Sequence, residues 1–302
     1  AAQLARMLPK GVLVQETSRV LPENRENTMQ GAKSIVGGTS ASGLITLGKG
    51  DTSSVPLVFL PAIGGGAFIY RDLAAKLETL HPIHAFEAPG LWDDRTPLES
   101  VEALAEHFLR QLHAELPAQS PILAGSSFGG MVAWEMTRQL AACGTPPSAL
   151  LMIDTPGPGY LPRPLADDAE ILAYLLAGDD PDGRFAEYCR KLRSIAPEER
   201  IAYAARSLET GLEEREIMRI LKVYRANLHA MFSYCTQALG ERVVFLRASE
   251  TNSFTAPHPE LAWVPLAEGG MEILPIAGSH ATMLDAAHAP QLAATIRRVL
   301  GL

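Results

Sequence analysis

Short apolar runs and longer amphipathic stretches alternate along most of the chain. The run VPLVFLPA ends at three glycines, and FIYRDLAAKLETL then spaces its apolar residues at helical intervals. The same order returns in IHAFEAPG with SVEALAEHFLRQLHAEL, and again in SPILAG with MVAWEMTRQLAACG. The pattern predicts strands that alternate with helices, which is typical of an α/β fold with a mostly parallel central sheet and helices on both faces.

The alternation stops between about residues 156 and 238, where three helical patterns follow one another without a strand. Strand-like ERVVFLRAS and MEILPIAG then precede a closing helical pattern, QLAATIRRVLGL. We predict one α/β domain over residues 46–302 with a helical lid insertion at about 156–238. Residues 1–45 lack sustained periodicity and are interpreted as an N-terminal linker or arm.

Apolar side chains of the predicted lid are candidates for the wall of a substrate chamber. Ordinary packing between helices explains any single one of them equally well. The candidates are Leu172, Leu175, Leu176, Ile217, Ile220 and Leu221.

Charge and cysteine content narrow the function classes. The formal net charge of -8 argues against a nucleic-acid or anionic-membrane surface, which would favour clustered Lys and Arg. Three widely spaced cysteines fit neither a disulfide framework nor a zinc site. No apolar run approaches the ~20 residues of a membrane-spanning helix, and no signal-peptide pattern is present. We therefore expect a cytoplasmic protein without a metal.

The pentapeptide GSSFG, with Ser127 at its centre, lies directly after the strand pattern PILA and directly before a helical pattern. This setting is typical of the nucleophile elbow of the α/β-hydrolase fold, in which a strained turn presents the serine hydroxyl above the sheet. The flanking glycines allow neighbouring backbone to approach. We predict Ser127 as the nucleophile, and a Ser/Gly-rich turn without chemistry is the alternative.

A serine nucleophile needs a histidine as general base and an acid that orients it, which in this fold follow in the order serine, acid, histidine. Asp154 ends the strand pattern ALLMI, and His280 follows EILPIAG. Both positions are strand ends, where catalytic groups gather in parallel sheets. Glu250 competes as the acid because it follows a later strand, and His288 is the rival histidine.

An acyl-transfer site also needs backbone N–H donors for the negative charge that develops on the carbonyl oxygen. Phe128, the residue after the nucleophile, supplies one. The loop PAIGGG can supply a second from Ile63 or, as the less favoured choice, Gly64. A phosphate-binding loop is the alternative for the three glycines, but neither G-x-x-x-x-G-K-[ST] nor G-x-G-x-x-G accompanies them.

Five segments together resemble the thioesterase domains that end polyketide and nonribosomal peptide synthetases. They are LVFLPAIGGGAFIYRDLAAKL, EAPG, ILAGSSFGGMVAWEM, LLMIDTPGPG and IAGSHATML. The resemblance covers residues from about 45 to the end. It departs from the family pattern at Ser126 and Phe128, which flank the nucleophile, in a way that is similar to some fatty-acyl thioesterases.

The resemblance implies a serine thioesterase with Asp154 as the acid and a helical lid before the histidine strand. It also implies an upstream carrier domain that delivers an acyl or peptidyl chain on a phosphopantetheine arm, with no further cofactor. Release could occur by hydrolysis or by macrocyclisation. A discrete editing thioesterase, a carboxylesterase and a non-catalytic binding protein on the same scaffold are the alternatives.

Overall fold

The structure is a computed structural model of the 302-residue chain. It describes residues 13–14 (backbone only), 43–51, 53–77, 81–116, 120–158, 165, 167–177, 183–208, 211–251 and 257–301. The predicted arm, residues 1–45, therefore lies outside the described residues except for positions 13–14 and 43–45.

The centre of the described chain is an eight-stranded sheet in the order β1-β8-β7-β6-β5-β3-β4-β2. All neighbouring strands are parallel except β2 and β4, which are antiparallel. The strands are β1 (Leu13–Val14), β2 (Leu44–Gly48), β3 (Leu57–Leu60), β4 (Ile83–Phe86), β5 (Ile122–Ser126), β6 (Ala149–Ile153), β7 (Val243–Glu250) and β8 (Met271–Ser279).

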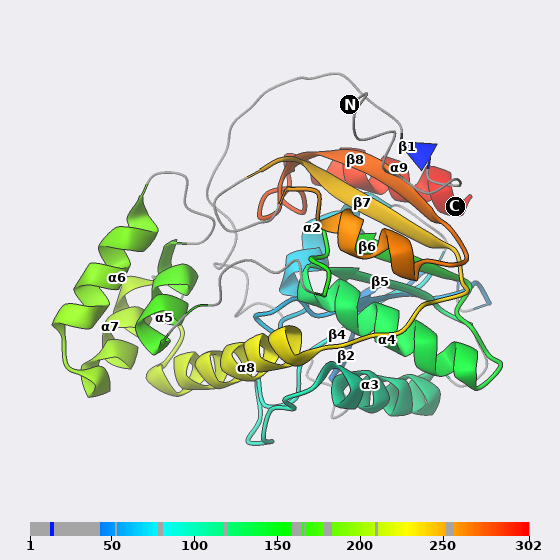
Figure 1. Cartoon of the computed structure of the whole chain (residues 1–302). Coiled ribbons are helices and arrows are strands. Elements are labelled where there is room, and N and C mark those ends of the chain that lie inside the picture. Colours follow the sequence, from blue (N-terminus) through cyan, green and yellow to red (C-terminus); the bar gives the residue numbers. More distant parts are fainter. Residues whose placement is uncertain are drawn as a thin grey trace.

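Helices cover both faces of the sheet (Figure 1). One layer contains α3 (Val101–Glu115) and α4 (Phe128–Ala142), and the opposite layer contains α2 (Arg71–Leu77) and α9 (Ala289–Leu300). The hydroxyl of Ser100 caps α3 by accepting a hydrogen bond from the N–H of Ala103 at 3.2 Å. Short 3₁₀ turns complete this part of the chain: η3 (Phe68–Tyr70), η5 (Pro259–Ala262) and η6 (Val264–Leu266).

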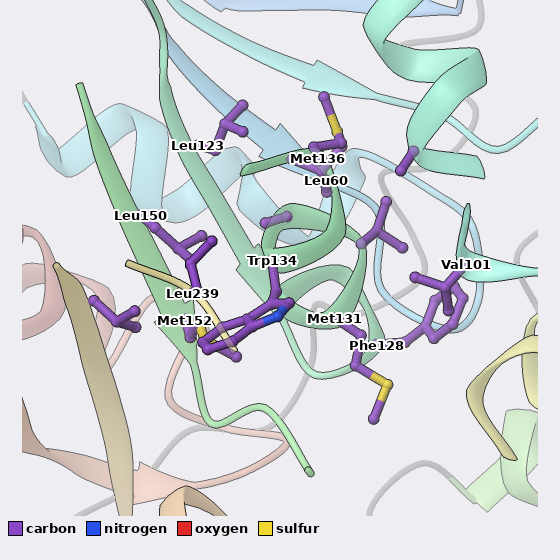
Figure 2. Packing of buried hydrophobic residues seen from close by; sticks show 14 of the residues in the cluster. Leu60, Val101, Leu123, Phe128, Met131, Trp134, Met136, Leu150, Met152 and Leu239 are labelled. Carbon is purple, nitrogen blue, oxygen red and sulfur yellow. The ribbon is translucent and has the colours of Figure 1, made fainter. Parts of the chain in front are cut away.

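Alternate strand residues pack on opposite sides of the sheet because successive side chains of a strand point to opposite faces. In β3, Val58 and Leu60 belong to the hydrophobic cluster with α3 and α4, whereas Leu57 and Phe59 belong to the cluster with α2 and α9. All four are fully buried. Figure 2 shows the first cluster, with Phe128, Met131 and Trp134 of α4 packed close to the strands.

Between β6 and β7 the chain forms a run of helices without a described strand: α5 (Asp168–Ala177), α6 (Arg184–Ser194), η4 (Pro197–Glu199), α7 (Arg200–Ser207) and α8 (Glu214–Ser233). We call this run the α5–α8 insertion. Helices α5, α6 and α7 lie together to one side of the sheet, and α8 extends from them back toward α3 and α4 (Figure 1).

Helix α8 belongs to two hydrophobic clusters. Its first half contributes Ile217 and Val223 to the cluster of the α5–α8 insertion. Its last turns contribute Ala230 and Met231 to the hydrophobic cluster with α3 and α4. A capping box between Glu213 and Glu216 fixes its start. The helix therefore packs against both the insertion and the α/β core.

The architecture confirms the predicted α/β class, with a mostly parallel sheet covered on both faces. The antiparallel edge strand β2 and helix α7 were not predicted as separate elements from the sequence pattern. None of the helices in the described ranges is both long enough and apolar enough to cross a membrane.

Candidate active site

Ser127 lies in the sharp turn between β5 and α4. Its φ of 54° and ψ of −126° place a non-glycine residue in a sparsely populated backbone region, which is the geometry of a nucleophile elbow. From residue 121 to residue 137, Ser127 alone is not buried. The turn thus lifts one hydroxyl out of a packed core.

Glycines on each side of Ser127 make this turn possible. A Cβ atom on Gly125 would overlap the carbonyl group of Gly129, and a Cβ on Gly129 would overlap the carbonyl oxygen of Leu60. The start of α4 therefore approaches both β5 and the end of β3 more closely than any side chain allows. This close approach explains why the sequence places glycines around the serine.

Asp154 follows β6, the strand next to β5, and its φ of 45° is also positive. Its Oδ2 lies 2.7 Å from Nδ1 of His280, and its Oδ1 accepts a hydrogen bond from the N–H of Ala248 at 2.9 Å. Its own N–H donates to the carbonyl of Leu246 at 2.8 Å. The residue is 4% exposed, and the hydrogen bond from Ala248 of β7 holds the carboxylate where its other oxygen faces the imidazole.

His280 directly follows β8, and its side chain is 18% exposed. Because Nδ1 faces the carboxylate, Nε2 is the nitrogen available to a reacting hydroxyl. Within the described residues, the Ser127 hydroxyl makes no hydrogen bond, so the structure joins His280 to Asp154 but does not join Ser127 to His280 by a bond. Catalytic hydrogen bonds of this kind often tighten only when substrate binds.

The rival residues lie in other surroundings. Glu250 is exposed on β7, and among the described residues its carboxylate makes no hydrogen bond or ion pair with His280, whose carboxylate partner is Asp154. Nδ1 of His288 lies 2.9 Å from the carbonyl of Thr282, just before α9. Geometry therefore favours Asp154 and His280 over both alternatives.

Two candidate oxyanion donors lie at the same edge of the sheet. Phe128 is the first residue of α4, so its N–H has no acceptor within the helix. The loop after β3 forms a turn in which the N–H of Gly65 donates to the carbonyl of Ala62 at 2.8 Å, and Ile63 and Gly64 are its central residues. Their N–H groups take no part in the hydrogen bond that closes the turn.

A buried tyrosine ties the two candidate donor segments together. The hydroxyl of Tyr70 donates to the carbonyl of Leu60 at 2.7 Å and accepts from the N–H of Ser126 at 2.9 Å. Burial raises the pKa of this hydroxyl well above its ordinary value, so it remains a neutral donor and acceptor. Sequence reasoning missed Tyr70 because nothing in its helical pattern distinguishes it from a core aromatic.

The sequence profile of the thioesterase domain matches residues 55–300. The chain belongs to the thioesterase domain family. This match confirms the predicted family, the α/β-hydrolase fold and an enzyme of the thioesterase kind.

Relatives of this thioesterase domain include parts of much longer proteins. It is 27% identical over 250 residues to the dimodular nonribosomal peptide synthase of Bacillus subtilis (strain 168). The matched region covers 82% of this chain and 10% of that relative. The thioesterase domain therefore spans about a tenth of the length of this curated relative.

Solved structures of similar fold include both synthetase domains and a discrete enzyme. The Vlm2 thioesterase domain bound with a dodecadepsipeptide matches with a TM-score of 0.64 at 25% identity, covering 87% of this chain and 100% of that one. YbtT, a type II thioesterase, matches with a TM-score of 0.64 at 22% identity, covering 86% and 98%. The second likeness shows the fold alone.

All six predicted chamber residues belong to α5 or α8 of the α5–α8 insertion, and four of them are buried. Leu172, Ile217, Ile220 and Leu221 are between 0% and 8% exposed within its hydrophobic cluster, whereas Leu175 and Leu176 are partly exposed. The four buried side chains therefore pack the insertion, and a substrate would reach them only if its helices moved apart. That these six residues line a chamber stays a prediction.

Proposed function

We propose that this thioesterase domain releases an acyl or peptidyl chain from the phosphopantetheine thioester of a carrier protein, through an acyl-enzyme on Ser127. The observation that carries the proposal is the strained turn that presents Ser127 at the strand end next to the hydrogen-bonded pair of Asp154 and His280. Nucleophilic acyl transfer needs a nucleophile, a general base and an acid that orients the base, and Ser127, His280 and Asp154 are the candidates for these roles.

In the first step, Ser127 Oγ attacks the thioester carbonyl while His280 Nε2 accepts the hydroxyl proton. Asp154 stabilises the imidazolium through Nδ1. The N–H of Phe128 and an N–H from the loop at Ile63 and Gly64 bind the developing oxyanion. The carbon–sulfur bond then breaks, His280 protonates the departing thiolate, and the acyl chain remains as an ester on Ser127.

In the second step, His280 removes a proton from the second nucleophile. The second nucleophile attacks the ester carbonyl, the bond between the acyl carbon and Ser127 Oγ breaks, and His280 returns the proton to Oγ. Water gives a free acid, whereas a hydroxyl or amine of the bound chain gives a macrolactone or macrolactam. We propose that the α5–α8 insertion acts as a lid that controls which nucleophile arrives. The similar Vlm2 domain, which was solved with a dodecadepsipeptide bound, supports a long chain as substrate.

The phosphopantetheine arm enters as part of the substrate, so the proposed steps require no other cofactor. A pocket of about 170 Å³ between residues 90–97 and α8 is a candidate contact for the carrier. Its lining contains four cations, Arg95, Arg215, Arg219 and Lys222, against two carboxylates, Asp93 and Asp94. This local positive charge on a chain of net charge -8 would attract the phosphate of the arm.

The test combines active-site labelling with substrate preference. The protein is treated with a fluorophosphonate, and the adduct is located by mass spectrometry, with Ser127→Ala as the control. Hydrolysis of acyl N-acetylcysteamine thioesters is then compared with that of the matching oxygen esters. Labelling of Ser127 together with faster thioester turnover supports the proposal.

The remaining outcomes separate the alternatives. A preference for oxygen esters would indicate a carboxylesterase. Absence of labelling from folded protein, with no turnover of either ester, would indicate a binding protein on the hydrolase scaffold. Preference for short acyl groups misloaded on a free-standing carrier would indicate an editing thioesterase.

A further inference from the structure

A side chain from the α5–α8 insertion holds the loop after β3. Asn227 of α8 is 2% exposed, and its Nδ2 donates a hydrogen bond of 2.8 Å to the carbonyl of Ile63, 164 residues earlier. One helical turn before it, Val223 packs so closely on the same loop that a Cβ on Gly65 would overlap its side chain. The loop thus meets α8 at two adjacent points.

The hydrogen bond from Asn227 fixes one particular peptide unit. The Ile63 carbonyl and the Gly64 N–H belong to the same trans peptide, in which the two groups point in opposite directions. Holding the carbonyl toward Asn227 therefore directs the Gly64 N–H away from α8. This peptide is the central unit of the turn closed by Ala62 and Gly65, and the closing bond leaves its orientation free.

Two orientations of this peptide are compatible with the same closing hydrogen bond. Type I and type II turns differ by a rotation of the central peptide through about 180°, and type II requires a positive φ at the third residue, which favours glycine there. The third residue is Gly64, yet its φ is not positive. Glycine at this position permits both orientations, so Gly64 itself does not select the one that the structure holds. Asn227 is the side chain bonded to the carbonyl that would reverse.

We propose that Asn227 is a positioning residue for the oxyanion hole, because it selects the orientation of the Ile63–Gly64 peptide and so the direction of the Gly64 N–H. The inference rests on the proposed function, since it takes the loop after β3 as the second oxyanion donor and, within that loop, the N–H of Gly64 in place of the N–H of Ile63 that the sequence pattern favours. It also means that the helix which supports the insertion sets the geometry of the catalytic edge.

A double-mutant cycle tests the proposal. Asn227→Leu keeps the number and branching of the side-chain heavy atoms but removes the donor. Gly64→Ala disfavours the reversed peptide because alanine resists a positive φ. A Cβ on Gly64 meets no atom within 4 Å, so the alanine fits the present orientation. We expect Asn227→Leu to lower kcat by about 10- to 100-fold with little change in KM, short of the ~10²–10³-fold loss of a deleted oxyanion donor.

The decisive comparison is the same Asn227→Leu substitution made on the Gly64→Ala background. There we expect a loss of less than about threefold, since the reversed orientation is already excluded. Equal losses of kcat on both backgrounds would overturn the proposal. So would an effect confined to KM, which would assign Asn227 to substrate binding instead.

Controls separate positioning from stability and from the proposed function itself. Met231→Ala removes a side chain of similar burial one turn further along α8 that makes no hydrogen bond to the loop, and it should lower the melting temperature without lowering kcat. Asn227→Ala serves if the leucine variant does not fold. Fluorophosphonate labelling and turnover of the unmodified protein report on the function of Ser127 independently of every Asn227 variant.

Discussion

The hydroxyl of Tyr70 accepts a hydrogen bond from the N–H of Ser126, the residue before the proposed nucleophile. The same hydroxyl donates to Leu60, at the end of the strand that precedes the candidate oxyanion loop. One buried oxygen therefore bridges the end of β5, which precedes the proposed nucleophile, and the end of β3, which precedes the candidate oxyanion loop.

Replacing Tyr70 by phenylalanine should leave a buried carbonyl and a buried N–H without partners. We expect a loss of about 1–3 kcal/mol in the free energy of unfolding, together with a lower kcat. Urea unfolding and thioester turnover measure the two effects. Tyr188→Phe on α6 is the control, because in the described structure its hydroxyl makes no hydrogen bond. Equal losses in the two variants would show that the effect of Tyr70→Phe does not come from its two hydrogen bonds.

The proposed acid can be distinguished from its rival by two isosteric substitutions. Asp154→Asn should lower kcat by about 10³- to 10⁴-fold, because the amide no longer holds His280 in the productive tautomer. Glu250→Gln should leave turnover close to that of the unmodified protein. The reverse pattern would show that the contact between Asp154 and His280 is structural only.

A carboxylate on α4 gives the fold a predictable dependence on pH. Burial alone raises the pKa of Glu135, but hydrogen bonds from Arg138, Gln139 and Tyr234 outweigh it and hold the pKa below its ordinary value of 4.5. Such a group stabilises the fold above the ordinary pKa, and this stabilisation is lost as pH falls through the depressed value.

Glu135→Gln should therefore destabilise the protein by about 1.5–3 kcal/mol near pH 7, where the charged hydrogen bonds are intact. The difference from the unmodified protein should shrink below about pH 4.5. Chemical unfolding followed across pH 3–8 measures this difference. A difference that stays constant over that range would show that the charge of Glu135 does not contribute.

Charge reversal in the basic pocket tests the proposed carrier contact. Arg215→Glu combined with Lys222→Glu should raise KM for a carrier-bound thioester, and the effect should weaken as salt is added, because screened charges attract less. KM for the N-acetylcysteamine thioester should not change. Arg190→Glu on α6 is the control, since it reverses an exposed charge outside the pocket; the same rise in KM there would contradict a local site.

Local sequence patterns were sufficient to predict the order of strands and helices and the strand ends that carry Ser127, Asp154 and His280. These features follow from short-range periodicity and from glycine placement, such as Gly125 in the turn. They also follow from the rule that the carboxyl ends of parallel strands lie at one edge of the sheet. The hydrogen-bonded contact between Asp154 and His280 agrees with that rule, although β7 lies between the two strands that carry them.

Contacts that join distant parts of the chain could not be predicted in this way. Asn227 occurs in an amphipathic helix, where a polar residue usually faces solvent, and only tertiary packing buries it against Ile63. Leu172 and Ile217 were chosen as chamber candidates because they are apolar, and each is buried in the cluster of the insertion. Their role in a chamber stays a prediction. Periodicity identifies a buried face but not the partner against which it packs.

The continuity of α8 limits how the thioesterase domain can be engineered. A chimaera could exchange the insertion for that of another thioesterase domain. A junction within Val223–Asn227 would divide between two parents the pair of residues that meets the loop after β3. A junction after Ser233 transfers the whole helix but then requires a matching loop at residues 61–66 from the same donor. The insertion and the candidate oxyanion loop would thus have to come from the same parent protein.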